Sequence, residues 1–374
     1  MSVALIAHYL GPRLGIGQYL NRLLPPLVEE LISRGTKVKI LASPNAFENT
    51  PTLQELADSV NILPPLDYSP AKRYGWVATR LSGYCAQEGI EALVWLSNPI
   101  VLPWHPPTIA VLHDVNEWKA ANKYGDRIKT ALRSLIYLDA SIRFAQQIIV
   151  VSKATENDLR HFRPNPRLQQ KLKTIPNGVD SALAKLPTVS IPAPTGPFLL
   201  SVGRIDPAAK RLPEAVALTT QLRELSGEPW ELHLVGGMNT STQASGEAFL
   251  KSIESLPWVQ YHGHISDRIL AQWYREATAV VFLSDREGFG LPIAEAASFG
   301  RFVVVSQGNQ AGLEAGGSAI ITVDPDQPRE AAEKVMGGLK EKQLAEISSN
   351  LPKWETAAMA YADEIGRASC RERV

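Results

Sequence analysis

The residues with the clearest capacity for chemistry lie in one segment, Ser-Asp-Arg-Glu-Gly-Phe-Gly-Leu-Pro-Ile-Ala-Glu, at positions 284–295. It follows the apolar run 279–283, which predicts a buried strand. One acid, Glu287, precedes the glycines, and a second, Glu295, follows a proline suited to the start of a helix. Backbone N–H groups at such a turn can bind phosphate, and a carboxylate can accept hydrogen bonds from sugar hydroxyls. The pattern therefore predicts a phosphate site with Glu287 at the mouth of a cleft and Glu295 facing outward in the first helical turn.

The order of strand, acid, Gly-Phe-Gly-Leu-Pro, second acid and Ala-Ser-Phe-Gly resembles the paired-glutamate signature of one enzyme family. That family is the retaining glycosyltransferases with two Rossmann-like domains (GT-B), family 4, also called glycosyl transferases group 1. The resemblance implies that Glu295 binds the sugar-nucleotide donor and that Glu287 lies near the transferred sugar in a catalytic position. It implies further donor contacts through backbone amides, from Gly288, Phe289, Gly290 and Leu291. A helix N-terminus whose dipole favours acids is the plainer interpretation.

A second group of candidate residues follows the expected strand 198–202, where Gly203-Arg204 is succeeded by Lys210-Arg211. A guanidinium offers a planar fork to phosphate and an ammonium offers a point charge, so the two could neutralise a diphosphate without a metal. The family places an Arg and a Lys here for that purpose, so the resemblance implies Arg204 and Lys210 as donor-binding residues. Arg211 is the substitute if the register differs, and surface cations at a strand end are the alternative. Gly236-Gly237, after the strand 231–235, could add bare backbone to the same pocket.

Residues 11–19 form a glycine-rich turn after the expected first strand. The turn approximates a dinucleotide-binding fingerprint, but Leu20 replaces the last glycine. The resemblance implies that Gly15 and Gly17 contact the donor through close approach of their backbone. A tight turn without a ligand is the alternative.

His113-Asp114 closes the expected strand 108–112, where a parallel sheet presents residues to ligands. His113 resembles the active-site histidine of the family, which contacts the transferred sugar and the acceptor region. A histidine bonded to a loop carbonyl is the alternative, and His8 at the end of the first strand is a weaker candidate.

The pair Asp324 and Asp326 has the Asp-x-Asp spacing that binds a divalent metal in the other major glycosyltransferase fold. It follows the expected strand 319–323 and precedes Gln327-Pro328, which indicates a turn and a helix entry instead. The sequence has no His/Cys cluster with ligand spacing. We therefore expect no metal and no cofactor other than the donor substrate.

A chain of 374 residues exceeds the usual size of a single core, so two domains are expected. Lys plus Arg and Asp plus Glu each total 38, a balance that gives no support to a polyanionic partner, and nucleic acid is not expected. The two cysteines, Cys85 and Cys370, exclude a disulfide framework and suit a reducing cytoplasm. Without an apolar stretch of transmembrane length or a basic leader, a cytoplasmic location is predicted.

Short apolar runs alternate with helical patterns along the chain, which predicts α/β domains with doubly wound parallel sheets. The expected strands are 3–7, 37–41, 60–63, 92–96, 108–112, 147–151, 198–202, 231–235, 279–283, 302–305 and 319–323. Prolines at 187, 192, 194 and 197 indicate a linker, which separates an acceptor-binding domain, 1–187, from a nucleotide-sugar-binding domain, 197–350. The resemblance implies that a helix at about 354–363 crosses back to the first domain and that the domains face a central cleft.

Residues 364–374, Glu-Ile-Gly-Arg-Ala-Ser-Cys-Arg-Glu-Arg-Val, resemble the translation of a sequencing adapter. We therefore expect a non-native tail and leave it, with Cys370, out of the expected fold. The stretch 123–144, with an expected helix at 128–144, carries Lys and Arg residues among apolar ones. Such helices can lie on anionic lipid but are more often solvated faces of core helices. Peripheral contact with the inner membrane face is therefore kept as an alternative.

Together these residues predict a metal-independent, retaining transfer of a hexosyl group from a nucleoside-diphosphate sugar to a saccharide or lipid-linked acceptor. Two alternatives stay open. A nucleotide-sugar epimerase of related fold would bind the same donor and release a free isomer without an acceptor. An NAD-dependent oxidoreductase would use the glycine loop, but Leu20 and the lack of a convincing acid after the second strand oppose it.

Overall fold

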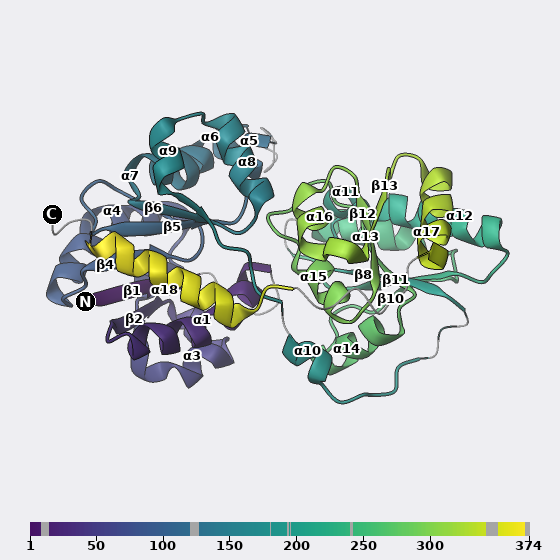
Figure 1. Cartoon of the computed structure of the whole chain (residues 1–374), viewed down its shortest axis with the longest axis horizontal. Helices are drawn as coiled ribbons and strands as arrows, with labels where there is room; N and C mark the ends of the chain where they lie inside the picture. The colour runs from purple at the N-terminus through teal and green to yellow at the C-terminus, as the bar shows by residue number, and fades with distance from the viewer. Residues whose placement is uncertain are drawn as a thin grey trace. The chain divides into compact units, whose positions relative to one another are not determined.

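The structure is a computed structural model that describes residues 1–8, 15–119, 127–179, 181–192, 194, 196–239, 242–341 and 351–370. The chain divides into two compact units (Figure 1). Unit 1 comprises Met1–Gly178 and Pro352–Val374, and unit 2 comprises Val179–Leu351. Each unit is built on its own parallel sheet, which is the α/β fold with two Rossmann-like domains that the alternating pattern predicted.

Unit 1 contains a seven-stranded sheet in the order β3-β2-β1-β4-β5-β6-β7. Its strands are β1 (Ser2–Ile6), β2 (Lys37–Ala42), β3 (Val60–Ile62), β4 (Ala92–Trp95), β5 (Thr108–Leu112), β6 (Gln147–Val150) and β7 (Leu172–Thr174). All the strand pairs are parallel, and the order reverses beside β1, as in a doubly wound sheet. The central strands β1, β4 and β5 are buried along their whole length, which explains their continuous apolar sequences.

Helices cover the sheet of unit 1. The longer ones are α1 (Gly15–Ser33), α4 (Pro70–Gln87), α8 (Lys153–Phe162) and α18 (Trp354–Cys370). The shorter ones are α2 (Pro44–Glu48), α3 (Pro51–Glu55), α5 (Asn116–Lys119), α6 (Arg127–Arg133), α7 (Ala140–Phe144) and α9 (Pro166–Lys171). The helix expected over 128–144 is α6 and α7 joined by a π-helical segment, Ser134–Asp139.

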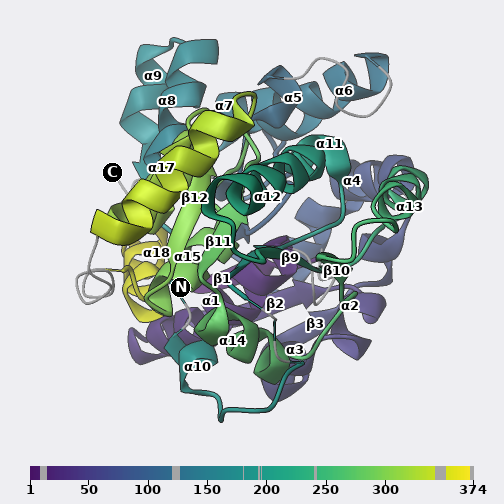
Figure 2. The same cartoon turned by 90° about the vertical axis from the view of Figure 1, so that its right-hand side faces the viewer.

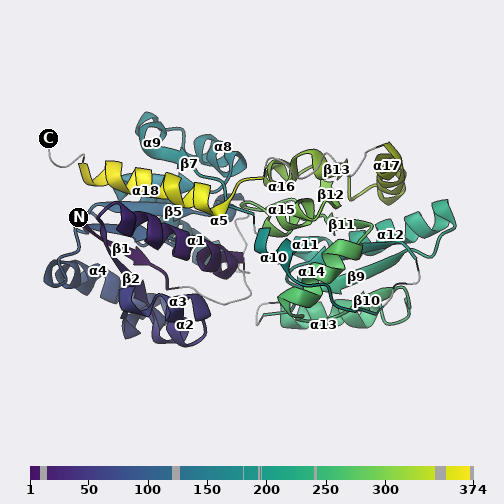
Figure 3. The same ribbon diagram turned by 60° about the horizontal axis from the view of Figure 1, so that its bottom comes forward.

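The last helix, α18, lies alongside α1 at the other end of the chain (Figure 3). The hydroxyls of Tyr19 and Tyr361 are 2.8 Å apart and buried, so the two helices share a hydrogen bond within the core. The helix continues past its expected end at residue 363, and Ile365 and Ala368 are buried. The side-chain amide of Gln147 donates to Glu364 at 3.0 Å. Part of the segment that we left out of the expected fold therefore packs in this unit.

Unit 2 contains a six-stranded sheet in the order β10-β9-β8-β11-β12-β13, again with parallel pairs. Its strands are β8 (Phe198–Val202), β9 (Glu231–Val235), β10 (Val259–Tyr261), β11 (Ala279–Phe282), β12 (Phe302–Ser306) and β13 (Ile320–Val323). Its helices are α10 (Ser181–Lys185), α11 (Pro207–Lys210), α12 (Leu212–Ser226), α13 (Gln243–Ser252), α14 (Asp267–Glu276), α15 (Leu291–Ser298), α16 (Gln310–Gly316) and α17 (Pro328–Glu341). Helices α12 and α17 lie side by side and pack against the sheet in one apolar core (Figure 2).

The boundary between the units lies at Gly178, earlier than the expected end of the first domain at residue 187. The reason is that the segment after Gly178 packs on unit 2. The guanidinium of Arg275, in α14, donates to the carbonyl oxygens of Ala184 and Leu186 at 3.0 and 2.5 Å. The prolines after residue 186 therefore lie within unit 2 and not at its edge.

Candidate functional site

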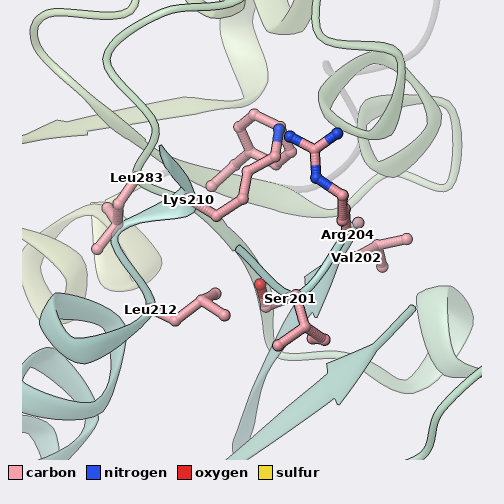
Figure 4. Close-up of a pocket in the computed structure, with 9 residues that line it drawn as sticks. Ser201, Val202, Arg204, Lys210, Leu212 and Leu283 are labelled. Atoms are coloured by element: carbon pink, nitrogen blue, oxygen red, sulfur yellow. The ribbon is translucent and has the colours of Figure 1, made fainter. Parts of the chain in front are cut away.

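A pocket lies at the carboxyl ends of two neighbouring strands of unit 2, β8 and β11 (Figure 4). Nine residues from these strand ends, from α11 and from the start of α12 line it: Ser201, Val202, Gly203, Arg204, Ile205, Lys210, Leu212, Phe282 and Leu283. Ligands of open parallel sheets bind at this edge. Figure 4 shows the charged ends of Arg204 and Lys210 on the same side of the pocket. The two cations singled out from the sequence therefore line one pocket.

Two glycines bring the ends of β8 and β9 close together beside the pocket: Gly203, which lines it, and Gly236, which does not. Gly203 and Gly236 have φ angles of 147° and 138°, which favour glycine. A Cβ atom on Gly236 would lie 1.9 Å from the carbonyl oxygen of Gly203. The N–H of Gly203 donates to the carbonyl of Val235 at 2.9 Å, which extends the β8–β9 pairing to this point. The close approach of the two strand ends therefore requires glycine at position 236.

Arg204 presents an unsatisfied donor in this pocket. Its Nη2 donates to Asp206 at 3.0 Å, and its side chain is 38% exposed. Its Nε is buried and has no hydrogen-bond partner among the described residues. A buried N–H without an acceptor is unfavourable, and an anionic ligand would supply one.

Lys210 already has an anionic partner. Its Nζ donates to Oε1 of Glu287 at 2.5 Å and lies 4.6 Å from the centroid of the Phe282 ring. The same carboxylate oxygen accepts the hydroxyl of Ser284 at 2.6 Å. Lys210 and Glu287, which the sequence offered as separate candidates, are thus in direct contact.

Arg211, the substitute for Lys210, has a different environment. Its guanidinium donates to Glu214 at 3.0 Å and to Asp285 at 3.1 Å, and it also forms an ion pair with Asp326. Lys210 lines the pocket and Arg211 does not.

The Asp-x-Asp pair lies in a turn. The N–H of Asp326 donates to the carboxylate of Asp324 at 3.0 Å. Within the part of the chain that the structure describes, no three His, Cys, Asp or Glu side chains gather in a way that could hold a metal ion.

The glycine-rich segment before α15 differs from the expected geometry. The helix begins at Leu291 after Gly290, whose φ is 93°, so Glu295 lies beyond the first turn and not within it. Its Oε2 accepts a 3.0 Å hydrogen bond from the hydroxyl of Tyr274, a buried residue of α14. The carboxylate is therefore partly turned toward the interior, which corrects the expectation that it faces outward.

None of the expected site residues of the glutamate motif lines this pocket. These residues are Glu287, Gly288, Phe289, Gly290, Leu291 and Glu295. Glu287 reaches it through Lys210, and the ring of Phe289 is buried.

In unit 1, His113 follows β5 and is partly buried. Its Nε2 is 2.9 Å from the carbonyl oxygen of Leu96, and its ring meets the Tyr19 ring edge-on at 4.6 Å between centroids. Burial lowers the pKa of His113 below its ordinary value, so the neutral imidazole prevails at pH 7. The alternative interpretation of His113, a histidine bonded to a loop carbonyl, therefore has its carbonyl in Leu96. A neutral imidazole can still take up a proton.

The remaining candidates of unit 1 are two glycines at the start of α1 and a histidine that follows β1. Gly15 and Gly17 are the first and third residues of this helix and do not belong to a preceding turn; residues 9–14 lie outside the described part. The ring of His8, after β1, packs edge-on against Trp95, and its Nδ1 is buried without a partner in the described structure. Burial lowers the pKa of His8 to about 3.

The chain has two parallel sheets of the Rossmann type, and two cations lie at the carboxyl edge of one of them, where such sheets bind their ligands. Comparison with known families makes this specific. Residues 22–183 match the model described as Glycosyltransferase Family 4, and residues 196–341 match the model described as Glycosyl transferases group 1. The chain belongs to this family and is a glycosyltransferase of the GT-B type.

Curated relatives match parts of the chain. Serotype-specific mannosyltransferase WbdA of Escherichia coli is 29% identical over 185 residues, which cover 43% of this chain and 21% of the relative. D-inositol 3-phosphate glycosyltransferase of Thermomonospora curvata is 28% identical over 239 residues, 62% of this chain and 52% of the relative. The chain thus spans about a fifth and about half of the length of these two relatives.

Solved structures share the fold over nearly the whole chain. Anabaena Alr3699/HepE in complex with UDP and glucose has a TM-score of 0.66 and 16% identity, covering 100% of this chain and 98% of that one. Sucrose-phosphate synthase from Thermosynechococcus elongatus has a TM-score of 0.67 and 20% identity, with 100% and 97% coverage. Among the helices of the described residues, none combines the length and apolar character needed to cross a membrane.

Proposed function

We propose that this glycosyltransferase moves a hexosyl group from a nucleoside-diphosphate sugar to a saccharide or lipid-linked acceptor, with retention of configuration and without a metal. The observation that carries the proposal is the pocket with Arg204 and Lys210 at the end of β8, where the Nε donor of Arg204 lacks a partner. A diphosphate supplies acceptors for that donor and charge for both cations.

The reaction needs stabilisation of a leaving group more than covalent help from the protein. The bond from the anomeric carbon to the diphosphate oxygen breaks, and the diphosphate leaves with the electron pair. A bond forms from the acceptor oxygen to the same carbon, and the proton of the acceptor hydroxyl passes to the departing diphosphate. Preorganised cations at the leaving oxygens lower the barrier because they need no reorganisation. We assign this role to Arg204 and Lys210, with donor contacts from Glu295 and the backbone amides of 288–291.

The remaining assignments concern the sugar and the acceptor. We propose that Glu287, held by Lys210 and Ser284, contacts the transferred sugar. We propose that unit 1 binds the acceptor and that neutral His113 contacts the reacting groups, with Gly15 and Gly17 near the donor phosphates. The names of the relatives, mannosyltransferases among them, and the UDP and glucose of one similar structure support a hexosyl donor.

The test is a thermal-shift screen with UDP-, GDP- and ADP-sugars, since a ligand of the folded state raises its stability by mass action. The donor that stabilises the protein is then incubated with acceptors in excess chelator. Transfer with retained anomeric configuration supports the proposal. Release of an isomeric nucleotide sugar without an acceptor would instead indicate the epimerase, and activity that requires added manganese would overturn metal independence.

An exposed apolar surface on α6 and the adjoining π-helical segment supports contact with a membrane. Ile128, Leu132 and Leu135 are 80%, 54% and 61% exposed, and the exposed cations Arg127 and Lys129 lie beside them. Apolar side chains flanked by cations complement the surface of an anionic bilayer. We propose that this surface docks on anionic lipid, which suits a lipid-linked acceptor.

Sedimentation with vesicles tests the docking. We expect the protein to bind phosphatidylglycerol vesicles better than phosphatidylcholine vesicles, and a Leu132→Ser/Leu135→Ser variant to lose this binding. Ile32→Ser is the control, because Ile32 is 54% exposed on α1 of the same unit. Equal sedimentation of the two variants would refute the assignment of this surface.

A further inference from the structure

Arg211 has a backbone conformation that its residue type disfavours. It lies between α11 and α12 with a φ of 52°, in the left-handed region. Apart from glycine, residues rarely adopt this region, because the Cβ atom crowds the backbone. The side chain is nevertheless only 15% exposed. The unfavourable backbone must therefore be compensated by what the side chain contacts.

Those contacts join three elements at the carboxyl edge of the sheet. The Nε of Arg211 donates to Glu214 in α12, Nη1 donates to Asp285 after β11, and Nη2 pairs with Asp326 after β13. Asp285 is held from its other side by the hydroxyl of Ser306 at the end of β12. A guanidinium suits this role because its planar fork engages several carboxylates at once.

The contact with Asp285 runs beside the contact that concerns the pocket. Lys210 and Arg211 are consecutive on one segment, and Asp285 and Glu287 are close together on the other. Lys210 pairs with Glu287 and Arg211 pairs with Asp285, so two neighbouring ion pairs hold the same two segments together. A diphosphate that binds Lys210 competes with Glu287 and so breaks the first ion pair. The second ion pair can persist, because Arg211 and Asp285 do not line the pocket.

We propose that Arg211 is a positioning residue that keeps the Lys210 and Glu287 segments together while Lys210 exchanges Glu287 for the diphosphate. Arg211 itself does not contact the donor. It acts through Lys210 because it fixes the backbone from which that lysine reaches the pocket. This inference rests on the proposed function, since it assumes a diphosphate ligand at Lys210.

A double-mutant cycle on nucleotide binding tests the proposal. The dissociation constants of UDP, GDP and ADP are measured by calorimetry for the wild type, Arg211→Gln, Lys210→Gln and the double variant. We expect Arg211→Gln to weaken binding roughly tenfold in the wild-type background, a coupling usual for contacting residues. In the Lys210→Gln background it should have less than about a twofold effect, because the residue through which it acts is absent.

The matched control is Arg223→Gln, which removes a different partly buried guanidinium, one that lies within α12. Arg223 donates to the carbonyl of Trp230 and lies over the Trp258 ring, outside the pocket lining. It should leave nucleotide affinity unchanged in both backgrounds. If Arg211→Gln shows no cooperative thermal transition, Asp285→Asn replaces it in the cycle, because this variant removes the same ion pair from the other segment.

The outcomes separate the two proposals. Equal losses of affinity in both backgrounds would show a structural role and overturn the positioning of Lys210, as would unchanged affinity in Arg211→Gln. If the wild type binds none of the three nucleotides, the proposed function itself fails, and the role of Arg211 fails with it.

Discussion

Replacing Arg204 by alanine probes the assignment on which the proposed function depends. The change removes a guanidinium that lines the pocket and whose buried Nε lacks a partner. It leaves Lys210 and its contact with Glu287 intact. It also leaves Asp206 without the cation that it now contacts at 3.0 Å. The variant therefore lowers the positive charge of the pocket and exposes a carboxylate near the expected position of the diphosphate.

The magnitude follows from the environment of the side chain. Loss of a preorganised donor to developing negative charge costs about 2–4 kcal/mol, or about 30- to 900-fold in rate. Arg204 is 38% exposed, so solvent screens part of its interaction. Its exchange of Asp206 for the diphosphate also offsets part of the gain. We therefore expect kcat/KM to fall by about 2–3 kcal/mol, or roughly 30- to 150-fold.

The assay is initial-rate transfer with the donor found in the screen, at a temperature well below the melting point of every variant. Arg204→Lys keeps the charge without the fork and should lie between the alanine variant and the wild type. Adding Asp206→Asn to Arg204→Ala should restore part of the activity, because it removes the unpaired negative charge near the diphosphate. The amide oxygen of the asparagine can still accept the hydrogen bond from the N–H of Ala209 at the start of α11. A kcat/KM within twofold of wild type in folded Arg204→Ala would refute the donor assignment.

Three other perturbations test the surroundings of the site. Gly236→Ala should lower the free energy of unfolding by at least about 3 kcal/mol because its Cβ would clash with a backbone carbonyl, whereas Gly227→Ala, with positive φ and open space, should cost about 1–2 kcal/mol in urea titrations. Burial lowers the pKa of His8 from 6.5 to about 3, so between these values the unfolded chain binds the proton more readily and stability falls as the pH drops. About 2 kcal/mol of the loss between pH 7 and 5 should vanish in His8→Leu, and identical pH profiles would contradict this account. Tyr274→Phe should lower the free energy of unfolding by about 1.5–3 kcal/mol because the carboxylate of Glu295 loses a buried donor; an unchanged urea midpoint would show that this hydrogen bond contributes nothing.

The sequence predicted most of the two sheets because their central strands are continuous apolar runs. The bounds of β5, β8 and β9 match the expected strands. The strands β7 and β10, which are three-residue edge strands without a buried residue, were not among the expected strands, whereas β3, another such strand, was. The two units divide at Gly178 and not at the expected linker, because the contacts of Arg275 with the carbonyl oxygens of Ala184 and Leu186 are tertiary and leave no local pattern in the sequence.

The position of the two cations follows from topology. Arg204 and Lys210 line one pocket because both lie in the segment that follows β8, at the carboxyl edge of the parallel sheet. The orientation of Glu295 could not be predicted, since it depends on where α15 begins and on Tyr274, which lies on another helix. The ion pair between Lys210 and Glu287 was also missed, although acids and cations at adjacent strand ends could have suggested it.

These ion pairs explain how the two cations of the pocket are accommodated in the absence of a ligand. A partly buried ammonium such as that of Lys210, 21% exposed, is costly without a counterion, and Glu287 supplies one. Asp206 does the same for Arg204 in part, but the Nε of Arg204 is left without a partner. If the proposed donor binds here, its diphosphate replaces carboxylate contacts instead of creating charge pairs from solvated ions, so the net electrostatic gain is a difference between two paired states.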